Sequence, residues 1–246
     1  MPVDETSLRV DRRGDRVIAT LSRPDARNAI SQRMIDELHA LCGELEDDPR
    51  TLILAGADGV FASGADIAEL RSRGAADARR GINTHAFARI AALPMPVIAA
   101  VDGYALGGGA ELAYAADIRI GTPRLRIGNP ETGLGIIAAA GATWRLPAIV
   151  GEARAAEMLL TGRILDGAEA REWGLVSSLH DPADLLAAAD ALADRIAAND
   201  PLATRHTKTA LHAAAHPAAE LELQAELFES AEKERRMTDF LERRGR

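Results

Sequence analysis

The stretch Pro96–Ala113, PVIAAVDGYALGGGAELA, decides the fold. Its first part, Pro96–Val101, is a short apolar run typical of a buried strand. The next part, Gly103–Gly109, is rich in glycine, and a helical pattern follows over roughly Gly109–Ala116. A buried strand that leads into a helix through a glycine turn is typical of α/β proteins, and glycine lets the backbone approach a ligand closely.

Strands and helices alternate on both sides of this stretch up to about residue 180, which again indicates an α/β fold. Ser31 is expected to cap a helix that runs to about Glu46. The polar, glycine-containing segment Gly74–Ile82 is expected to be a mobile connection. The other strands are expected at Arg16–Leu21, Thr51–Ala57, Ile118–Gly121, Leu125–Gly128 and Leu175–His180, and the other helices at Ala65–Arg71, Thr84–Leu93, Ala139–Val150 (interrupted by Pro147) and Glu152–Leu160.

The last part of the chain shows only helical patterns. These cover Pro182–Ala198, Leu202–Ala215 and Ala219–Glu242. We therefore expect two domains, a core over residues 1–181 that carries the active site and a helical region over residues 182–246.

The composition limits the classes of function. Of the 246 residues, 47% are hydrophobic, enough for a sizeable core, but only 3% are aromatic. The net charge is −8, and the arginines of 71–80 and 235–246 are interspersed with acids or near the terminus, so they are expected to be solvated. These features argue against a nucleic-acid partner, although a local basic pocket for a phosphorylated ligand is compatible with them.

Three further observations concern location and metals. Cys42 is the only cysteine, which excludes an internal disulfide and a thiolate cluster. The N-terminus lacks the pattern of a signal peptide and no apolar run is long enough to span a bilayer, so we expect a cytoplasmic protein with no membrane partner. His212 and His216 are four residues apart with no third ligand evident, so no metal site is expected.

Two carboxylates stand out by their surroundings. Glu111 follows Gly107–Gly109, and Glu131 follows Gly128-Asn129-Pro130. The first turn of a helix offers free backbone N–H groups that can stabilise negative charge on a ligand. For Glu111 alone the simpler interpretation is that the helix dipole favours an acid there. The loop Phe61–Ile67 has the same shape, and its Asp66 is expected to be a first-turn acid.

Several segments together resemble the enoyl-CoA hydratase/isomerase (crotonase) family. Pro96–Ala113 is similar to its second oxyanion loop. The others are LSRPDARNAI (21–30), similar to the opening motif, FASGADI (61–67), similar to the first oxyanion and CoA-binding loop, and IGNPETGL (127–134), similar to the segment with the second glutamate. The resemblance continues through Gly141–Leu146, Gly151–Gly162 and Gly174–Leu179, in the same order and over nearly the whole chain.

The resemblance implies a fold, an activity and an assembly. The fold would be a right-handed spiral of strand–strand–helix turns followed by a helical trimerisation region. The activity would be hydration of a 2-enoyl-CoA thioester, without metal or redox cofactor, coenzyme A being part of the substrate. The partners would be the acyl-CoA thioester and further copies of the chain, in a homotrimer or hexamer. The alternatives are a double-bond isomerase, which needs one acid, and a non-catalytic acyl-CoA-binding paralogue.

The resemblance also implies roles for residues. The N–H groups of Ala65 and Gly108 would hold the thioester oxygen, and Glu111 and Glu131 would be the catalytic glutamates. The CoA-binding turn would comprise Ala65, Asp66, Ile67 and Ala68. The chain departs from many hydratases at Ala138-Ala139, where they have Pro-Gly, and at Trp144, where the residue is often polar. The first departure is expected to leave the Ala139 amide available, and both put the preferred acyl chain in question.

Overall fold

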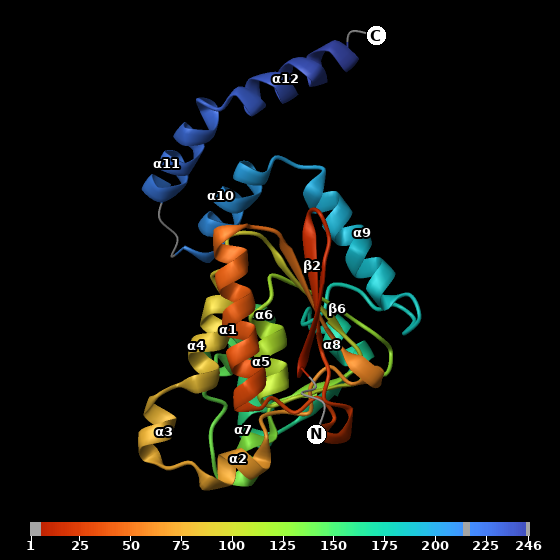
Figure 1. Cartoon of the computed structure of the whole chain (residues 1–246), viewed down its shortest axis with the longest axis vertical. Helices are drawn as coiled ribbons and strands as arrows, with labels where there is room; N and C mark the ends of the chain where they lie inside the picture. Colours follow the sequence, from red (N-terminus) through yellow and green to blue (C-terminus); the bar gives the residue numbers. More distant parts are fainter. Residues whose placement is uncertain (1–5, 214–216, 245–246) are drawn as a thin grey trace. The chain divides into compact units, whose positions relative to one another are not determined.

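The computed structural model describes residues 6–213 and 217–244 (Figure 1). They fall into two compact units, Met1–Ala193 and Asp194–Arg246. The first unit contains both sheets and the helices that pack on them, and the second contains only helices. The first unit therefore contains every residue assigned above to the site.

The larger sheet has five strands in the order β1-β2-β3-β4-β6. β1 is antiparallel to β2, and the following neighbours are parallel. The expected strands before residue 122 are confirmed to within two residues at their ends. They are β2 (Arg16–Leu21), β3 (Thr51–Gly56), β4 (Val97–Val101) and β6 (Ile118–Gly121). The edge strand β1 (Leu8–Arg12) was not expected.

The smaller sheet shows which structural unit is repeated along the chain. Its strands are β5 (Tyr104–Leu106), β7 (Arg126–Gly128) and β8 (Ile164–Asp166), in the order β5-β7-β8. β4 and β6 of the larger sheet are each followed, after a short turn, by β5 and β7 of the smaller one, and then by helices. After β3, Ala62 makes a single parallel bridge to Ala105 and so begins the same pattern. These are repeated strand–strand–helix turns.

Gly103 makes the corner between β4 and β5. Its φ is +61°, and a Cβ at this position would lie 2.0 Å from the carbonyl oxygen of Gly59. Only glycine allows both the left-handed conformation and this close approach. The glycine-rich segment Gly103–Gly109 thus contains a strand, β5, that the sequence analysis did not predict.

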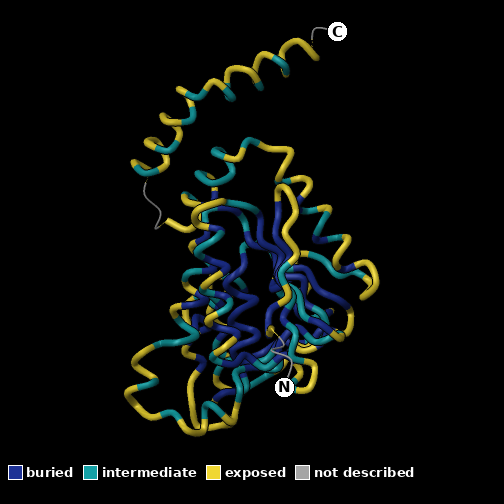
Figure 2. Tube along the Cα trace, viewed as in Figure 1, coloured by how far each residue is buried: buried dark blue, intermediate teal, exposed yellow. Residues whose placement is uncertain are grey.

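Helices cover one side of the larger sheet in Figure 1, where α1, α4, α5 and α6 contact one another in that order. α1 (Gln32–Asp47) begins after Ser31, whose hydroxyl accepts a hydrogen bond from the Met34 amide at 3.3 Å, as predicted. Figure 2 shows that strands and inner helix faces are buried. The remaining helices of this unit are α2 (Ile67–Ser72), α3 (Ala75–Arg79), α4 (Ile82–Ala91), α5 (Gly108–Tyr114), α6 (Ala142–Val150), α7 (Glu152–Thr161) and α8 (Gly167–Glu172), with α9 (Leu185–Ala197) running across the boundary between the units.

One segment of this unit contains a helix where none was expected, and two further expectations were wrong. The segment Gly74–Ile82 contains the short helix α3, at whose start the Asp77 carboxylate accepts a hydrogen bond from the Gly74 amide at 3.0 Å. Leu175–His180 is not a strand, because the amide of Leu175 is bonded to α8 and only Leu179 forms a bridge to the sheet. Pro147 lies inside α6 without ending it.

The second unit contains α10 (Pro201–His212), α11 (Pro217–Phe228) and α12 (Ala231–Arg244). The single helix expected over Ala219–Glu242 is therefore two helices. The Ser230 hydroxyl accepts a hydrogen bond from the Lys233 amide at 3.2 Å and so starts a new helix. The end of the expected helix Leu202–Ala215, and His216, lie outside the described residues. In the described chain, none of the helices has the length and apolar character needed to cross a membrane.

Candidate active site

Glycines at the start of α5 allow three segments to meet. Gly107 has φ +51°, and a Cβ there would lie 3.1 Å from Oε1 of Glu131. A Cβ at Gly109 would lie 2.3 Å from the carbonyl oxygen of Ala62. A side chain at Gly109 would clash with the backbone of Ala62, and one at Gly107 would strain the backbone and push against Glu131. The glycines therefore bring the end of β5, the Ala62 segment and Glu131 against the start of α5.

Gly108 and Ala65 place two backbone amides beside the same small space. Gly108 is the first residue of α5, where a helix offers no acceptor for its own N–H. The nitrogen of Ala65 lies 3.5 Å from the point that a Gly108 Cβ would occupy. Within the described residues, no hydrogen bond uses the Ala65 N–H. The structure thus brings together the two residues that the sequence analysis paired as donors.

Asp66 has a structural part in this turn. Its Oδ1 accepts hydrogen bonds from the amides of Ala68 at 3.1 Å and Glu69 at 3.4 Å, and so caps α2. Its Oδ2 lies 3.1 Å from Nη2 of Arg23. Burial alone would raise the pKa of Asp66, but the bonds from Arg23 and the two amides outweigh it and lower the pKa. The Ile67 side chain in the same turn is exposed.

Glu111 is a buried acid held by a loop. It lies in α5 with 3% of its surface exposed, and its Oε1 accepts hydrogen bonds from the amides of Ala140 at 2.6 Å and Ala142 at 3.1 Å. Burial, and to a smaller extent the nearby charge of Glu131, raise the pKa of Glu111 to about 7 against the opposing effect of these two amides. The loop engages Glu111 through Ala140 and Ala142, whereas the carbonyl of Ala139 accepts a hydrogen bond from Thr84 Oγ1 at 2.7 Å.

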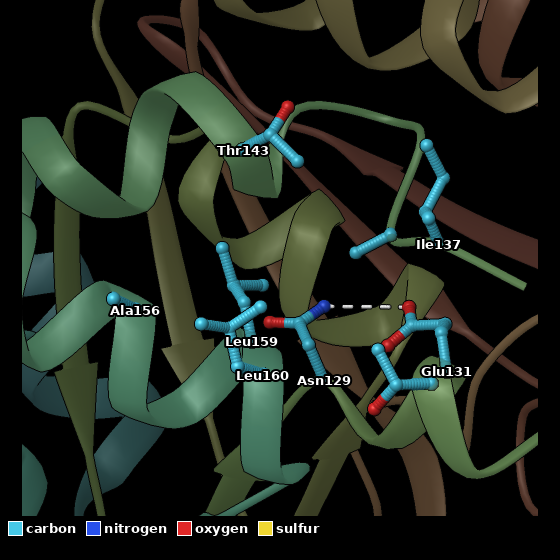
Figure 3. Close-up of a pocket in the computed structure, with 9 residues that line it drawn as sticks. Asn129, Glu131, Ile137, Thr143, Ala156, Leu159 and Leu160 are labelled. Atoms are coloured by element: carbon cyan, nitrogen blue, oxygen red, sulfur yellow. Dashed lines mark hydrogen bonds between the residues drawn. The ribbon is translucent and has the colours of Figure 1, made fainter.

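Glu131 is the second buried acid, 8% exposed, in the 3-10 helix Pro130–Leu134. Its Oε1 accepts a long hydrogen bond, 3.4 Å, from Nδ2 of Asn129, drawn as a dashed line in Figure 3. Its Oε2 is buried and has no hydrogen-bond partner in the part of the chain that the structure describes. Burial raises the pKa of Glu131 as well. A buried oxygen without a partner is costly, and it marks a position where a ligand or water can bind.

Asn129 and Tyr114 support Glu131 and were missed by the sequence analysis. The Tyr114 hydroxyl donates to Oδ1 of Asn129 at 3.0 Å, which leaves the Asn129 amide to face Glu131. Tyr114 is fully buried in α5, and burial raises its pKa, so it stays a neutral donor. Asn129 follows Gly128 in the segment that carries Glu131, whereas no sequence signal distinguishes Tyr114 from a core aromatic residue.

A cavity of about 260 Å³ opens beside Glu131 (Figure 3). Figure 3 shows Leu159 and Leu160 of α7 close to Asn129, with Glu131 and Ile137 across from them. The contribution of α7 was not predicted. The cavity is lined by Asn129, Glu131, Thr132, Ile137, Ala138, Thr143, Ala156, Leu159 and Leu160. It is therefore an apolar space with one carboxylate.

The described residues contain no group of three or more His, Cys, Asp or Glu side chains placed to hold a metal ion. His216, one of the two histidines considered above, lies outside these residues.

Comparison with known proteins decides the family. The sequence model of the enoyl-CoA hydratase/isomerase family matches residues 15–246. The chain belongs to this family. It is 36% identical over 246 residues to the short-chain-enoyl-CoA hydratase of Clostridium acetobutylicum, covering 96% of this chain and 94% of that protein. It is 41% identical over 197 residues to a probable enoyl-CoA hydratase of Mycobacterium leprae, covering 79% and 77% of the two chains.

Solved structures of the family agree with the fold. The crystal structure of an enoyl-CoA hydratase from Bacillus anthracis superposes with a TM-score of 0.90 at 32% identity, over 96% of each chain. The predicted crotonase-like α/β fold with a helical C-terminal region is thereby confirmed. The roles of Glu111, Glu131, Ala65 and Gly108 within this fold remain predictions.

Proposed function

We propose that this member of the family is an enoyl-CoA hydratase, which adds water across the double bond of a 2-enoyl-CoA thioester. Coenzyme A would enter as part of the substrate, and no metal or redox cofactor takes part in the proposed steps. One observation carries the proposal: two buried carboxylates, Glu111 and Glu131, lie beside a space bordered by two backbone amides. The hydratase names of the relatives support it.

The two amides would activate the substrate. The thioester oxygen accepts hydrogen bonds from Ala65 and Gly108, which draws electrons away from the β-carbon and makes it electrophilic. Each donor of such a hole contributes about 3 kcal/mol to transition-state stabilisation, because it is already oriented before the charge develops. Gly108 is suited to this role because its N–H lies at the start of a helix, where the aligned peptide dipoles also favour negative charge.

The two acids would move the protons. As the water oxygen bonds to the β-carbon, one ionised glutamate takes a proton from the water, and the π electrons of the double bond pass to the thioester oxygen. The other glutamate then gives its proton to the α-carbon as the carbonyl re-forms. This cycle needs one proton shared by the pair. The raised pKa values of Glu111 and Glu131 keep a proton there near neutral pH.

The ends of the substrate would bind on opposite sides of the amides. We assign the CoA portion to the turn formed by Ala65, Asp66, Ile67 and Ala68, together with Gly108. Because Arg23 and the start of α2 use the Asp66 carboxylate, the turn offers mainly its backbone. The acyl chain would enter the apolar cavity beside Glu131, between α7 and Ile137.

We also propose that the chain assembles as a homotrimer or as a hexamer of two trimers. In the second unit, Leu221, Phe228, Met237, Phe240 and Leu241 are each more than half exposed. Apolar side chains that remain exposed in this number indicate an interface, and homo-oligomers are usually closed and symmetric.

The activity is tested with the purified chain and a short and a long 2-enoyl-CoA. A hydratase removes the absorbance of the conjugated thioester and forms a 3-hydroxyacyl-CoA that is heavier by one water. An isomerase instead converts a 3-enoyl-CoA into a 2-enoyl-CoA without a change of mass. Binding of both esters without any turnover would identify a non-catalytic acyl-CoA-binding protein and overturn the proposal.

A further inference from the structure

A third nitrogen borders the space between Ala65 and Gly108. The point that a Gly108 Cβ would occupy is 3.4 Å from Nδ2 of Asn83, closer than the 3.5 Å to the nitrogen of Ala65. Asn83 is the second residue of α4, far from both in sequence. A side-chain amide and a backbone amide therefore lie against the same spot, beside the first residue of α5.

The Asn83 side chain has no hydrogen-bonding role among the described residues. It is half-buried, and none of the hydrogen bonds among the described residues involves its amide group. It does not cap its own helix, because the residue that precedes α4 is Gly81, with φ +57°, and α4 has no side-chain cap. Asparagine is a poor helix former whose usual value at a helix start is such a cap. Neither capping nor hydrogen bonding within the fold therefore explains why position 83 is an asparagine.

The start of α4 is fixed relative to the proposed acids. Thr84, the next residue, donates from Oγ1 to the carbonyl oxygen of Ala139 at 2.7 Å. The following residue, Ala140, donates its N–H to Glu111. α4 also contacts α5 directly. Asn83 is thus held between the loop that orients Glu111 and the helix that begins with Gly108.

We propose that the Asn83 amide is a third hydrogen-bond donor to the thioester oxygen, acting with the N–H groups of Ala65 and Gly108. This inference rests on the proposed function. In the reaction, electrons from the double bond accumulate on that oxygen as water adds. An enolate oxygen has one more lone pair than the carbonyl oxygen, so a third donor binds the transition state better than the substrate. Such an interaction raises kcat rather than affinity.

The test replaces Asn83 in the full-length chain. Asn83→Leu removes the donor at similar size, and Asn83→Asp replaces it with an acceptor of the same shape. We expect kcat for a 2-enoyl-CoA to fall on the order of 10²-fold in both variants, as for loss of one oxyanion donor, with little change in KM. His85→Ala, an exposed position in the same helical turn, is the matched control and should keep wild-type kcat.

A second measurement separates this inference from the hydratase assignment. Difference infrared spectroscopy reports how strongly the carbonyl of a bound enoyl-CoA is polarised, and it needs no turnover. The carbonyl band should lie closer to its frequency in water in both variants than in the wild type. If the wild type polarises the carbonyl but does not hydrate, the hydratase assignment fails while the role of Asn83 is still measured.

Three results would overturn the role of Asn83. These are a kcat within twofold of wild type, a rise in KM with unchanged kcat, or a carbonyl band at the wild-type frequency in the variants. If Asn83→Leu does not fold, as judged by circular dichroism, the isosteric Asn83→Asp decides.

Discussion

Ala140 and Glu111 are joined by a hydrogen bond of 2.6 Å, from the backbone nitrogen of the first to Oε1 of the second. The amide of Ala142 donates to the same oxygen at 3.1 Å. One oxygen of the carboxyl group is therefore fixed by the loop before α6, which leaves the other for the proposed proton transfer. The two partners are 29 residues apart in the sequence. The sequence around either residue alone therefore does not predict how the acid is held.

The first prediction concerns stability and pH. Burial raises the pKa of Glu111 from 4.5 to about 7, so the folded chain binds this proton more tightly than the unfolded chain. The contribution of Glu111 to stability must then fall as pH rises from about 4.5 to about 7, and above that range the cost is roughly 3 kcal/mol. Glu111→Gln, which cannot ionise, should be more stable than wild type at pH 8 and about equal at pH 4.5.

Urea unfolding at the two pH values measures this difference. The charged groups that influence the pKa of Glu111 are Glu131 and Arg145, and Glu111 in turn raises the pKa of Tyr114. Tyr114→Phe, which keeps Glu111 ionisable, serves as the control and should retain the decrease in stability between pH 4.5 and 8. A Glu111→Gln variant with the same pH dependence as wild type would show that another group causes it.

The second prediction concerns catalysis by the two acids. Glu111→Gln and Glu131→Gln should each lower the hydration rate by at least about 10²-fold, since each removes one proton-transfer group. Binding of a saturated acyl-CoA should change little, because glutamine keeps the shape and the acceptor oxygen. Stopped-flow turnover and calorimetric titration give the two quantities. Glu172→Gln, at an exposed position of α8, is the control. Near-wild-type turnover in either site variant would remove that residue from the mechanism.

Particular residues show what the sequence alone could predict. Ser31 and the apolar spacing after it predicted α1 correctly, because both signals lie within the helix itself. β5 was missed because three residues, Tyr104–Leu106, are too few to show a period. Gly108 and Ala65 were paired through family resemblance, and their proximity is confirmed by the structure. Asn83 could not be found, because its position beside Gly108 results from the packing of α4 on α5.

The third prediction is that substitutions of two neighbouring glycines have different effects. Gly108→Ala places a methyl group 3.4 Å from Asn83 Nδ2 and 3.5 Å from the nitrogen of Ala65, an ordinary contact that crowds the nitrogens proposed to bind the oxygen. The variant should fold normally and lose most of its activity. Gly109→Ala places a methyl group 2.3 Å from the oxygen of Ala62, so it should lower the thermal stability instead. Thermal melting and an activity assay on both variants compare the effects, and an active Gly108→Ala would contradict the proposed oxyanion site.

The fourth prediction concerns acyl-chain length. Ala156 lines the cavity from α7, and Ala156→Phe should fill much of its volume of about 260 Å³. Each methylene that can no longer be buried costs about 0.8 kcal/mol, or roughly fourfold in kcat/KM. The variant should therefore lose activity with long 2-enoyl-CoA esters and keep it with a four-carbon ester. Ala153→Phe, exposed on the same helix, is the control. An equal loss at every chain length would show that the chain lies elsewhere.

The fifth prediction concerns assembly. Leu221 and Phe228 of α11 are 67% and 54% exposed, and burial of each in an interface would contribute roughly 1.5–3 kcal/mol. The double variant Leu221→Glu/Phe228→Glu should therefore lower the mass measured by light scattering from that of a trimer or hexamer toward that of one chain. Gln224→Glu, an exposed polar position on the same helix, controls for the added charge.

Deletion of residues from Ala219 onward tests the same surface more severely. If a neighbouring chain helps to complete the CoA site, the deletion should abolish assembly and activity together. The point variants separate these effects, because they alter the surface of α11 and leave every residue of the proposed site in place. If the wild-type protein has the mass of a monomer by light scattering at micromolar concentration and is fully active, the proposed assembly is refuted. The same result would also remove any contribution of a second chain to CoA binding.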